Sequence, residues 1–181
     1  NGDIHTLNMK LAGLDSRDQA KTFIYAFMYG AGANKIGKIV GKGKQAGLTL
    51  IDKFLKSIPA LNKLRQEVYQ TARSGKLKGL DGRILYPRST HSALNTLIQG
   101  AGAVVCKQWL VEMIKSVRKE KLDVKLVASI HDEYQFEVSN EDVERFCQIT
   151  KESIQTTEKV LNLKCPLDNE YNVGLTWAET H

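Results

Sequence analysis

Two short stretches of alternating polarity, separated by three charged or polar residues, constrain the fold of this chain more than any other feature. Residues 124–130 are rich in β-forming side chains, and residues 134–138 again alternate between apolar and polar side chains. A period of two is typical of a strand that buries one face. The pattern predicts a hairpin whose tip carries His131, Asp132 and Glu133. Because helical patterns flank it, the chain is predicted to have an α+β fold.

The helix signals are clearest near the start of the chain. Residues 16–29 are predicted to form a helix, with Ser16 and Gln19 as a capping box and Gly30 as its end. Ser139 or Asn140 is expected to cap a final helix that ends near residue 161. Further helices are predicted over residues 48–58, 59–73 and 90–119, the last with a buried apolar centre at 101–106.

Three segments are predicted to lie outside the long helices. Residues 30–47 are rich in glycine and lysine, which favours loops and short helical turns. Residues 75–86 contain an Asp-Gly turn between short apolar runs, which predicts a two-stranded ribbon. Residues 165–177 are predicted to form a last strand.

The charge favours a polyanionic partner, either nucleic acid or an anionic membrane surface. The 181 residues include 26 Lys plus Arg against 20 Asp plus Glu, for a net charge of +6. No apolar run is long enough to span a bilayer, and the lysines lie among glycines and not on an amphipathic helix, so no membrane partner is expected. A soluble, cytoplasmic protein with three reduced cysteines is therefore predicted.

One face of the first strong helix carries Arg17, Lys21, Tyr25 and Tyr29 at intervals of four residues. At about 100° per residue these side chains lie within an arc of roughly 120°. Two cations followed by two aromatic rings suit the phosphates, sugar and base of a nucleoside triphosphate. The alternative is a surface helix with solvated cations and half-buried tyrosines.

The predicted hairpin tip is a candidate metal site. A tight turn can bring the adjacent carboxylates of Asp132 and Glu133 toward one hard cation, and Mg²⁺ held by carboxylates and substrate phosphates is usual in phosphoryl transfer. The alternative is an ordinary polar turn.

His91, Asn95 and Gln99 form a third set, again spaced by four residues on a predicted helix. Their uncharged donors suit the base acceptors of the minor groove, which would allow inspection of a duplex without regard to its sequence. The alternative is a polar helix start that is simply exposed.

Together these elements resemble the family A DNA polymerases, and the phage replicative branch in particular. The nucleotide-binding pattern R-x3-K-x7-Y-G stands at Arg17, Lys21, Tyr29 and Gly30, and the palm signature H-D-E at residues 131–133. Further matching segments are DIH at 3–5, LDGR at 80–83 and HSALNTLIQGAGA at 91–103. The resemblance covers essentially the whole chain and implies a fragment of the right-hand polymerase fold, with helical fingers and part of an antiparallel palm sheet. It places the fingers at residues 1–75, with the nucleotide-binding helix at 16–29, and the C-terminal palm with the HDE hairpin at residues 76–181.

The resemblance also implies a role for each candidate residue. His5, Arg17 and Lys21 would hold the incoming dNTP, with Lys21 also donating to the departing pyrophosphate. Tyr25 would sense the 3′ edge of the sugar, and Tyr29 would stack near the templating base. The residues expected to contact the primer-template are His91, Asn95, Gln99 and His131. The residues expected at a catalytic site with two Mg²⁺ ions are Asp132, a metal ligand, and Glu133, a supporting carboxylate.

One part of the family pattern is missing. The upstream palm motif D-x-S-x-x-E-L-R, whose Asp bridges both metals, would lie just before Asn1. The chain is therefore expected to be a fragment or a split subunit, inactive until an N-terminal segment or partner chain supplies that Asp and the thumb. The implied reaction is two-metal transfer of a dNTP to a primer 3′-hydroxyl.

Two other functions stay open. A single-subunit RNA polymerase shares the Arg, Lys and Tyr-Gly spacing, although Tyr25, Glu133 and the polar helix near Asn95 argue against it. A non-catalytic DNA-binding accessory module is the other. Its phosphate contacts would come from Lys35, Lys38, Lys42 and Lys44.

Overall fold

The computed structural model describes residues 3–180, which divide into two compact units between Gln99 and Gly100. The elements are mixed helices and small antiparallel sheets, as the predicted α+β class requires. The division falls inside helix α6 (Ala93–Glu120) and not near residue 75. The assignment of fingers and palm to residues 1–75 and 76–181 stays a prediction.

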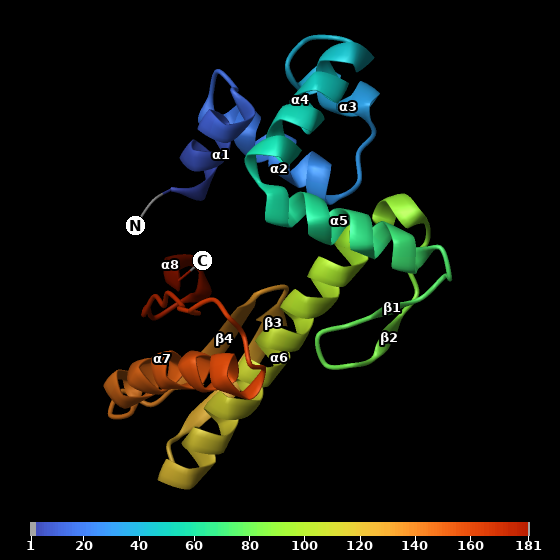
Figure 1. Cartoon of the computed structure of the whole chain (residues 1–181). Coiled ribbons are helices and arrows are strands. Elements are labelled where there is room, and N and C mark those ends of the chain that lie inside the picture. The colour runs from blue at the N-terminus through green and yellow to red at the C-terminus, as the bar shows by residue number, and fades with distance from the viewer. Residues whose placement is uncertain (1–2, 181) are drawn as a thin grey trace. The chain divides into compact units, whose positions relative to one another are not determined.

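Five helices make up most of the first unit (Figure 1). They are α1 (Ile4–Ala12), α2 (Arg17–Met28), α3 (Ala33–Ile39), α4 (Lys44–Ser57) and α5 (Pro59–Ala72). The start of α2 follows the prediction in one half of the capping box, because the Ser16 hydroxyl accepts from the Gln19 N–H at 3.2 Å. The Gln19 side chain accepts instead from the Asp15 N–H, at 3.3 Å.

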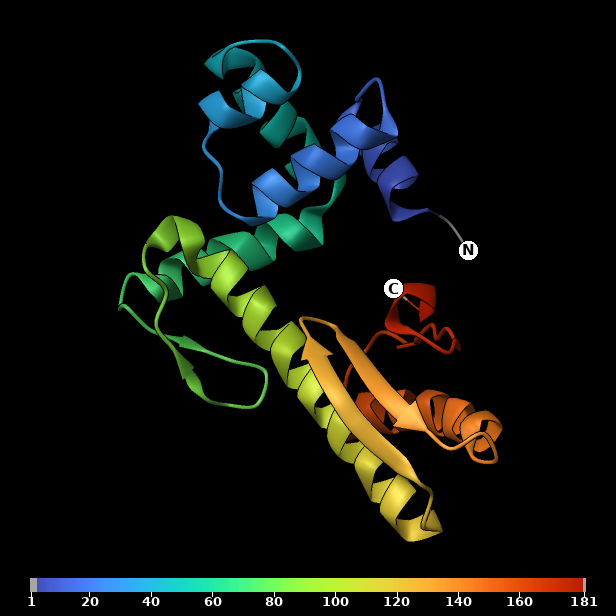
Figure 2. The same ribbon diagram turned by 180° about the vertical axis from the view of Figure 1, so that it is seen from behind.

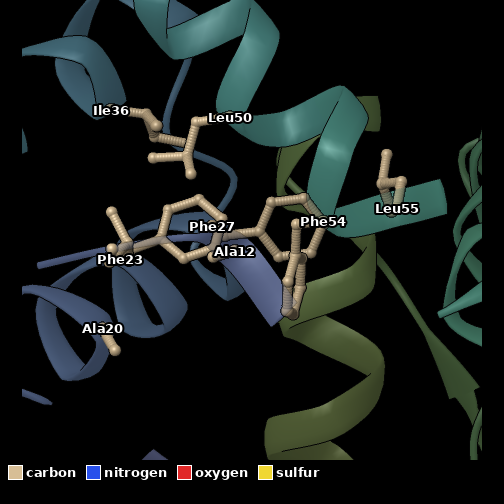
Figure 3. Packing of buried hydrophobic residues seen from close by; sticks show 9 residues of the cluster. Ala12, Ala20, Phe23, Phe27, Ile36, Leu50, Phe54 and Leu55 are labelled. Atoms are coloured by element: carbon tan, nitrogen blue, oxygen red, sulfur yellow. The ribbon is translucent and has the colours of Figure 1, made fainter. Parts of the chain in front are cut away.

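An aromatic cluster joins α2 to α4 in the core of this unit (Figure 3). The ring of Phe54 meets Phe23 at 5.1 Å and Phe27 at 5.5 Å, both edge to face. Such pairs stabilise by more than their buried area alone. Since Phe23 and Phe27 are buried on one side of α2, the opposite side of that helix is left exposed.

The glycine-rich segment 30–47 was predicted to be loops and short helical turns, and it holds the short helix α3 and the first turn of α4. Helices α3 and α4 pack there with their backbones almost in contact. A Cβ on Gly37 would lie 2.1 Å from the Gly43 carbonyl oxygen, and one on Gly47 would lie 1.8 Å from that of Ala33. The glycines therefore allow a close helix–helix approach that a propensity scale scores as a break.

The predicted ribbon is present as β1 (Leu77–Lys78) paired antiparallel with β2 (Ile84–Leu85). A 3₁₀ turn, η1 (Thr90–Ser92), then leads into α6 (Ala93–Glu120), close to the predicted helix over 90–119. Leu77 packs with Ala93 and Leu94 at the start of α6 in a second core cluster.

The second unit is built on the predicted hairpin, β3 (Val124–Ile130) and β4 (Glu133–Val138), which pairs antiparallel with a bulge between Leu126 and Ala128. Helices α6 and α7 (Val143–Val160) cover one face of the hairpin, as Figure 2 shows. Met113 from α6 and Phe146 from α7 are buried in the core between them.

Three predictions for the second unit are wrong. Residues 165–177 contain no strand; they run in irregular structure to the short helix α8 (Trp177–Thr180). Helix α7 has Asp142 as its N-cap, without a side-chain cap, and the Ser139 hydroxyl donates instead to the Asp142 carboxylate at 2.9 Å. The apolar centre of α6 is only half buried, and Ala103 within it is exposed.

No helix within residues 3–180 combines the length and the apolar character needed to cross a bilayer.

Candidate functional site

The exposed face of α2 presents Arg17, Lys21, Tyr25 and Tyr29, as their spacing predicts. Tyr25 is 52% exposed and Tyr29 is 59% exposed, although both side chains are large and partly apolar. The helix is held from behind by its buried phenylalanines, so this row of side chains is free to meet a ligand.

The N-terminal end of this face is tied to the start of α1. Nε of Arg17 donates to Oδ2 of Asp3 at 2.5 Å. The same carboxylate caps α1, because it accepts from the His5 N–H at 3.0 Å and from the Thr6 hydroxyl at 2.8 Å. The Arg17 guanidinium, aided by the Thr6 hydroxyl, holds the pKa of Asp3 well below its usual range. Asp3 therefore stays ionised at neutral pH and balances the charge of Arg17.

His5 lies beside the same face. Its ring centroid is 6.4 Å from that of Tyr25, with the planes tilted by 46°. Nδ1 of His5 is buried and has no hydrogen-bond partner among residues 3–180. The sequence segment DIH thus places His5 next to the middle of the α2 row.

The C-terminal end of α2 meets the helix that carries the predicted duplex-inspecting residues. Nε2 of Gln99 lies 3.5 Å from the Tyr29 hydroxyl, at the limit of a hydrogen bond. Gly30 has a φ of 76°, and a Cβ there would lie 2.3 Å from the His91 carbonyl oxygen. The structure therefore brings Tyr29, His91 and Gln99 together, while Asn95 lies half-buried on the same helix.

A cavity of about 400 Å³ opens beside this junction, and its lining includes residues that the sequence reasoning missed. The Arg65 guanidinium lies 4.8 Å from the centre of the Tyr69 ring and 5.8 Å from that of Phe27. Tyr69 in turn meets the His91 ring edge to face at 6.3 Å. The spacing of Arg65 and Tyr69 by four residues in α5 was the available signal for this pair.

In the second unit the hairpin tip is a two-residue turn. Ile130 pairs with Glu133, which leaves His131 and Asp132 between the strands. His131 has a φ of 53°, a left-handed conformation that costs energy for a residue other than glycine. Both turn residues are exposed, so they are available to a ligand.

Glu133 differs from its neighbours because it belongs to β4 and is half-buried, whereas the sequence placed it in the tip. Its carboxylate accepts a short hydrogen bond from Nε2 of Gln135, which lies two residues along the same strand. Gln135 is a second residue that the sequence reasoning missed; its position on the same strand face was the available signal.

Cys106 in α6 lies within electrostatic reach of the turn. Burial raises the pKa of its thiol, and the negative charge of Asp132 raises it further. The thiol is therefore protonated at neutral pH.

A divalent cation could use the oxygen atoms of Asp132 and Glu133. Carboxylate oxygens are hard donors of the kind that Mg²⁺ prefers. Within residues 3–180, however, no group of three or more His, Cys, Asp or Glu side chains is arranged to hold a metal ion. The donors present fit part of a magnesium site that further ligands would have to complete.

The chain belongs to DNA polymerase family A, whose sequence model matches residues 2–179. Within the family it is similar to phage enzymes. It is 40% identical, over its whole length, to the DNA-directed DNA polymerase of Enterobacteria phage T3, and covers 29% of that protein. It is 42% identical over 99% of its length to the DNA-directed DNA polymerase of Escherichia phage Phieco32, and covers 30% of that protein.

A more distant relative is DNA polymerase I of Geobacillus stearothermophilus. It is 25% identical over 98% of this chain, and the chain covers 21% of that protein. Among solved structures, the polymerase domain of Pol1 from M. smegmatis, in complex with DNA primer-template and dNTP, matches with a TM-score of 0.78. That match covers 86% of this chain and 31% of that one, at 20% sequence identity, and supports the predicted polymerase fold.

Proposed function

We propose that this chain is the C-terminal catalytic portion of a DNA-directed DNA polymerase, which joins a dNTP to a primer 3′-hydroxyl and releases pyrophosphate. The observation that carries the proposal is the order of groups along α2. The cations lie toward its start, His5 lies beside Tyr25, and Tyr29 meets Gln99 and His91 at its end. A nucleoside triphosphate has the same polarity, with phosphates at one end and a base that must be paired at the other.

The proposed roles follow from this order. Arg17, Lys21 and His5 would bind the triphosphate, and Lys21 would donate to the departing pyrophosphate. Tyr25 would lie beside the sugar, and Tyr29 would stack near the templating base. Most of the rate enhancement would come from positioning and from fixed positive charge, as is usual in phosphoryl transfer.

Four polar side chains would contact the primer-template. His91, Asn95 and Gln99 would face the minor groove, where every base pair offers acceptors. His131, exposed beside Asp132 at the hairpin tip, would also contact the primer-template.

Asp132 and Glu133 would hold Mg²⁺, with Asp132 as a direct ligand and Glu133 as a supporting carboxylate. The bound ions would stabilise charge on the attacking and leaving oxygens. Since the chain spans 29% and 30% of two of its phage relatives, we infer that an N-terminal segment or partner chain supplies the other metal-binding Asp and the thumb. The proposed site of action is the cytoplasm of a bacterial or phage-infected cell.

A reconstitution experiment tests this function. The chain is combined with a polypeptide that carries the upstream palm motif, and extension of a labelled primer is measured with Mg²⁺ and dNTPs. Extension should require both chains and should be abolished by Asp132→Ala. Glu67→Gln, an exposed change on α5, is the matched control and should leave it intact. Full activity of the Asp132→Ala enzyme would refute the site assignment, and a preference for rNTPs would favour the RNA polymerase alternative.

A second candidate, a DNA-binding accessory module, is favoured by the α3–α4 hairpin. No acidic residue occurs between Asp18 and Asp52, and the close backbone packing of α3 and α4 leaves the hairpin lysines exposed. The four are Lys35, Lys38, Lys42 and Lys44. Binding of a labelled duplex at increasing salt would weaken with a slope set by the phosphates neutralised, and replacing these lysines by glutamine should reduce that slope. Duplex binding without primer extension, even with the upstream partner present, would favour this module over the polymerase.

A further inference from the structure

Residues 169–175, together with Glu179 and Thr180, lie beside the strand that carries Glu133. A cavity of about 570 Å³ in the second unit is lined by β4, by α6 and α7, and by residues 169–175 with Glu179 and Thr180. Glu133 and Gln135 line the same cavity. The proposed catalytic hairpin and the C-terminal segment therefore line the same cavity.

A chain of hydrogen bonds connects the two. Nε2 of Gln135 donates to Oε1 of Glu133, and the hydroxyl of Thr180 donates to Oε1 of Gln135 at 3.2 Å. An amide side chain offers both a donor and an acceptor, so it can bridge a carboxylate and a hydroxyl. Because side chains at i and i+2 of a strand point to the same face, Gln135 is suitably placed to reach Glu133.

The C-terminal segment carries its own internal support. Oε2 of Glu179 accepts from the Leu175 N–H at 2.6 Å, and Nδ2 of Asn172 donates to the Thr180 carbonyl at 3.3 Å. The hydroxyl of Thr180 also lies 3.1 Å from the Trp177 carbonyl oxygen. These contacts fix Thr180 within a folded turn before it meets Gln135.

Apolar burial contributes little to holding this segment. Its large apolar side chains are half or more exposed: Tyr171 at 50%, Val173 at 60%, Leu175 at 94% and Trp177 at 56%. Farther back, Lys151 donates to the Asn169 carbonyl at 2.7 Å and to the Asp168 carboxylate at 2.9 Å. Polar contacts thus help to fix the segment to its own unit, and the hydrogen bond from Thr180 to Gln135 reaches the hairpin.

We propose that residues 171–180 form a positioning element for the Glu133 carboxylate, with Gln135 as the positioning residue and Thr180 as its anchor. This inference rests on the proposed function, in which Glu133 supports the metal site. Holding the carboxylate in one orientation before the metal arrives reduces the ordering that binding requires.

The test uses four variants of the chain: Thr180→Val, Thr180→Ser, Gln135→Leu and, as control, Glu137→Gln at an exposed position of the same strand. The first readout is the NMR signal of the Gln135 side-chain amide in the chain itself. Thr180→Val should shift it toward the value of a free amide. Thr180→Ser, which keeps the hydroxyl, should restore it.

The second readout is Mn²⁺ binding, followed by water proton relaxation in the chain combined with its upstream segment. Partners of metal-bound side chains typically change metal affinity by about 10–100-fold when they are replaced. Because Glu133 is a supporting carboxylate, we expect Gln135→Leu and Thr180→Val to weaken Mn²⁺ binding about 10-fold, at the lower end of that range. The kcat for primer extension should fall while the KM for dNTP changes little.

Wild-type Mn²⁺ affinity and kcat in both Thr180→Val and Gln135→Leu would overturn the proposal. So would equal losses in the Glu137→Gln control, because they would reflect general damage to the strand. Failure of the proposed function is a separate result: the wild-type assembly would not extend primers, while Thr180→Val would still shift the Gln135 amide signal.

Discussion

The same substitution at two helical glycines should have opposite effects on stability. Gly47 lies in α4 and Gly102 in α6, and both are in helix interiors. Replacing glycine by alanine inside a helix gains about 1 kcal/mol from backbone conformational entropy and helix propensity. If propensity alone decided the outcome, both changes would stabilise the protein equally.

The surroundings of the two positions differ. A Cβ on Gly102 would have no atom within 4 Å, so the propensity gain is kept in full. A Cβ on Gly47 would lie 1.8 Å from the Ala33 carbonyl oxygen and 2.8 Å from the Gly37 nitrogen, where an ordinary contact begins at 3.4 Å. The obstructing atoms belong to the backbone of α3 and cannot rotate away, so α3 and α4 must separate.

Overpacking a core costs about 1–3 kcal/mol, and a clash against backbone should lie at or above the upper end of that range. After subtraction of the propensity gain, Gly47→Ala should destabilise the first unit by about 2 kcal/mol. With a urea m-value of about 2 kcal/mol/M, the unfolding midpoint should fall by about 1 M. Gly102→Ala should raise the midpoint of the second unit by about 0.5 M.

Urea unfolding followed by circular dichroism measures both shifts, and amide hydrogen exchange assigns each change to its own unit. Protection should fall in α3 and α4 for Gly47→Ala and should be kept or rise in α6 for Gly102→Ala. A Gly47→Ala protein as stable as the wild type would refute the close backbone packing of α3 against α4.

The other predictions concern the aromatic core and one ion pair. Phe54→Ala should lower the free energy of unfolding by about 3–5 kcal/mol, because the ring is 2% exposed and packs edge to face on two other phenylalanines. Tyr86→Ala, at a position 69% exposed, should change the free energy of unfolding little, and urea unfolding measures both. The Arg145 guanidinium, which donates to Glu120 at 2.6 and 2.7 Å, lowers the pKa of Glu120 from its ordinary value of 4.5. This pair therefore stabilises the fold above that pH. The free energy of unfolding that Glu120→Gln loses relative to the wild type should shrink as the pH falls below 4.5 and disappear in stronger acid. An equal loss at pH 7 and pH 3 would contradict the assigned cause.

The parts of the fold that the sequence predicted correctly are those that local signals determine. Helix α2 has a capping residue, Ser16, and a regular burial period, and the β3–β4 hairpin has two alternating runs around a short turn. The start of α4 and its packing against α3 were missed because the glycines there serve contacts between helices. Whether Gly47 breaks a helix or packs against a neighbour depends on Ala33, which no local window relates to it.

The strand predicted for residues 165–177 was wrong for a related reason. Residues 171, 173, 175 and 177 alternate as in a strand, but a strand needs a hydrogen-bonded neighbour, and residues 165–177 form none within the described chain. The side chains of Glu179 and Asn172 bond to backbone groups of the tail instead.

In the candidate site, too, local spacing predicted some relations between residues, while others depend on the packed fold. Spacing by four residues correctly placed Arg17, Lys21, Tyr25 and Tyr29 on one face, because helix geometry alone sets that relation. The contact of Tyr29 with Gln99 joins residues distant in sequence, and that of Gln135 with Thr180 joins the hairpin to the tail. Such contacts depend on the packed fold, so spacing could not predict them.

The pairing of Arg17 with Asp3 bears on how the proposed site would take up its substrate. A guanidinium that already faces an ionised carboxylate attracts a single stray anion weakly, because the local charge is balanced. A triphosphate carries several negative charges and also meets Lys21, so it can compete for Arg17 where a simple anion cannot. If Arg17 turned away, Asp3 would lose its main partner, but its carboxylate would still accept from the His5 N–H and the Thr6 hydroxyl at the start of α1. The residue that balances the charge of Arg17 is therefore also the residue that caps α1, the helix that carries His5.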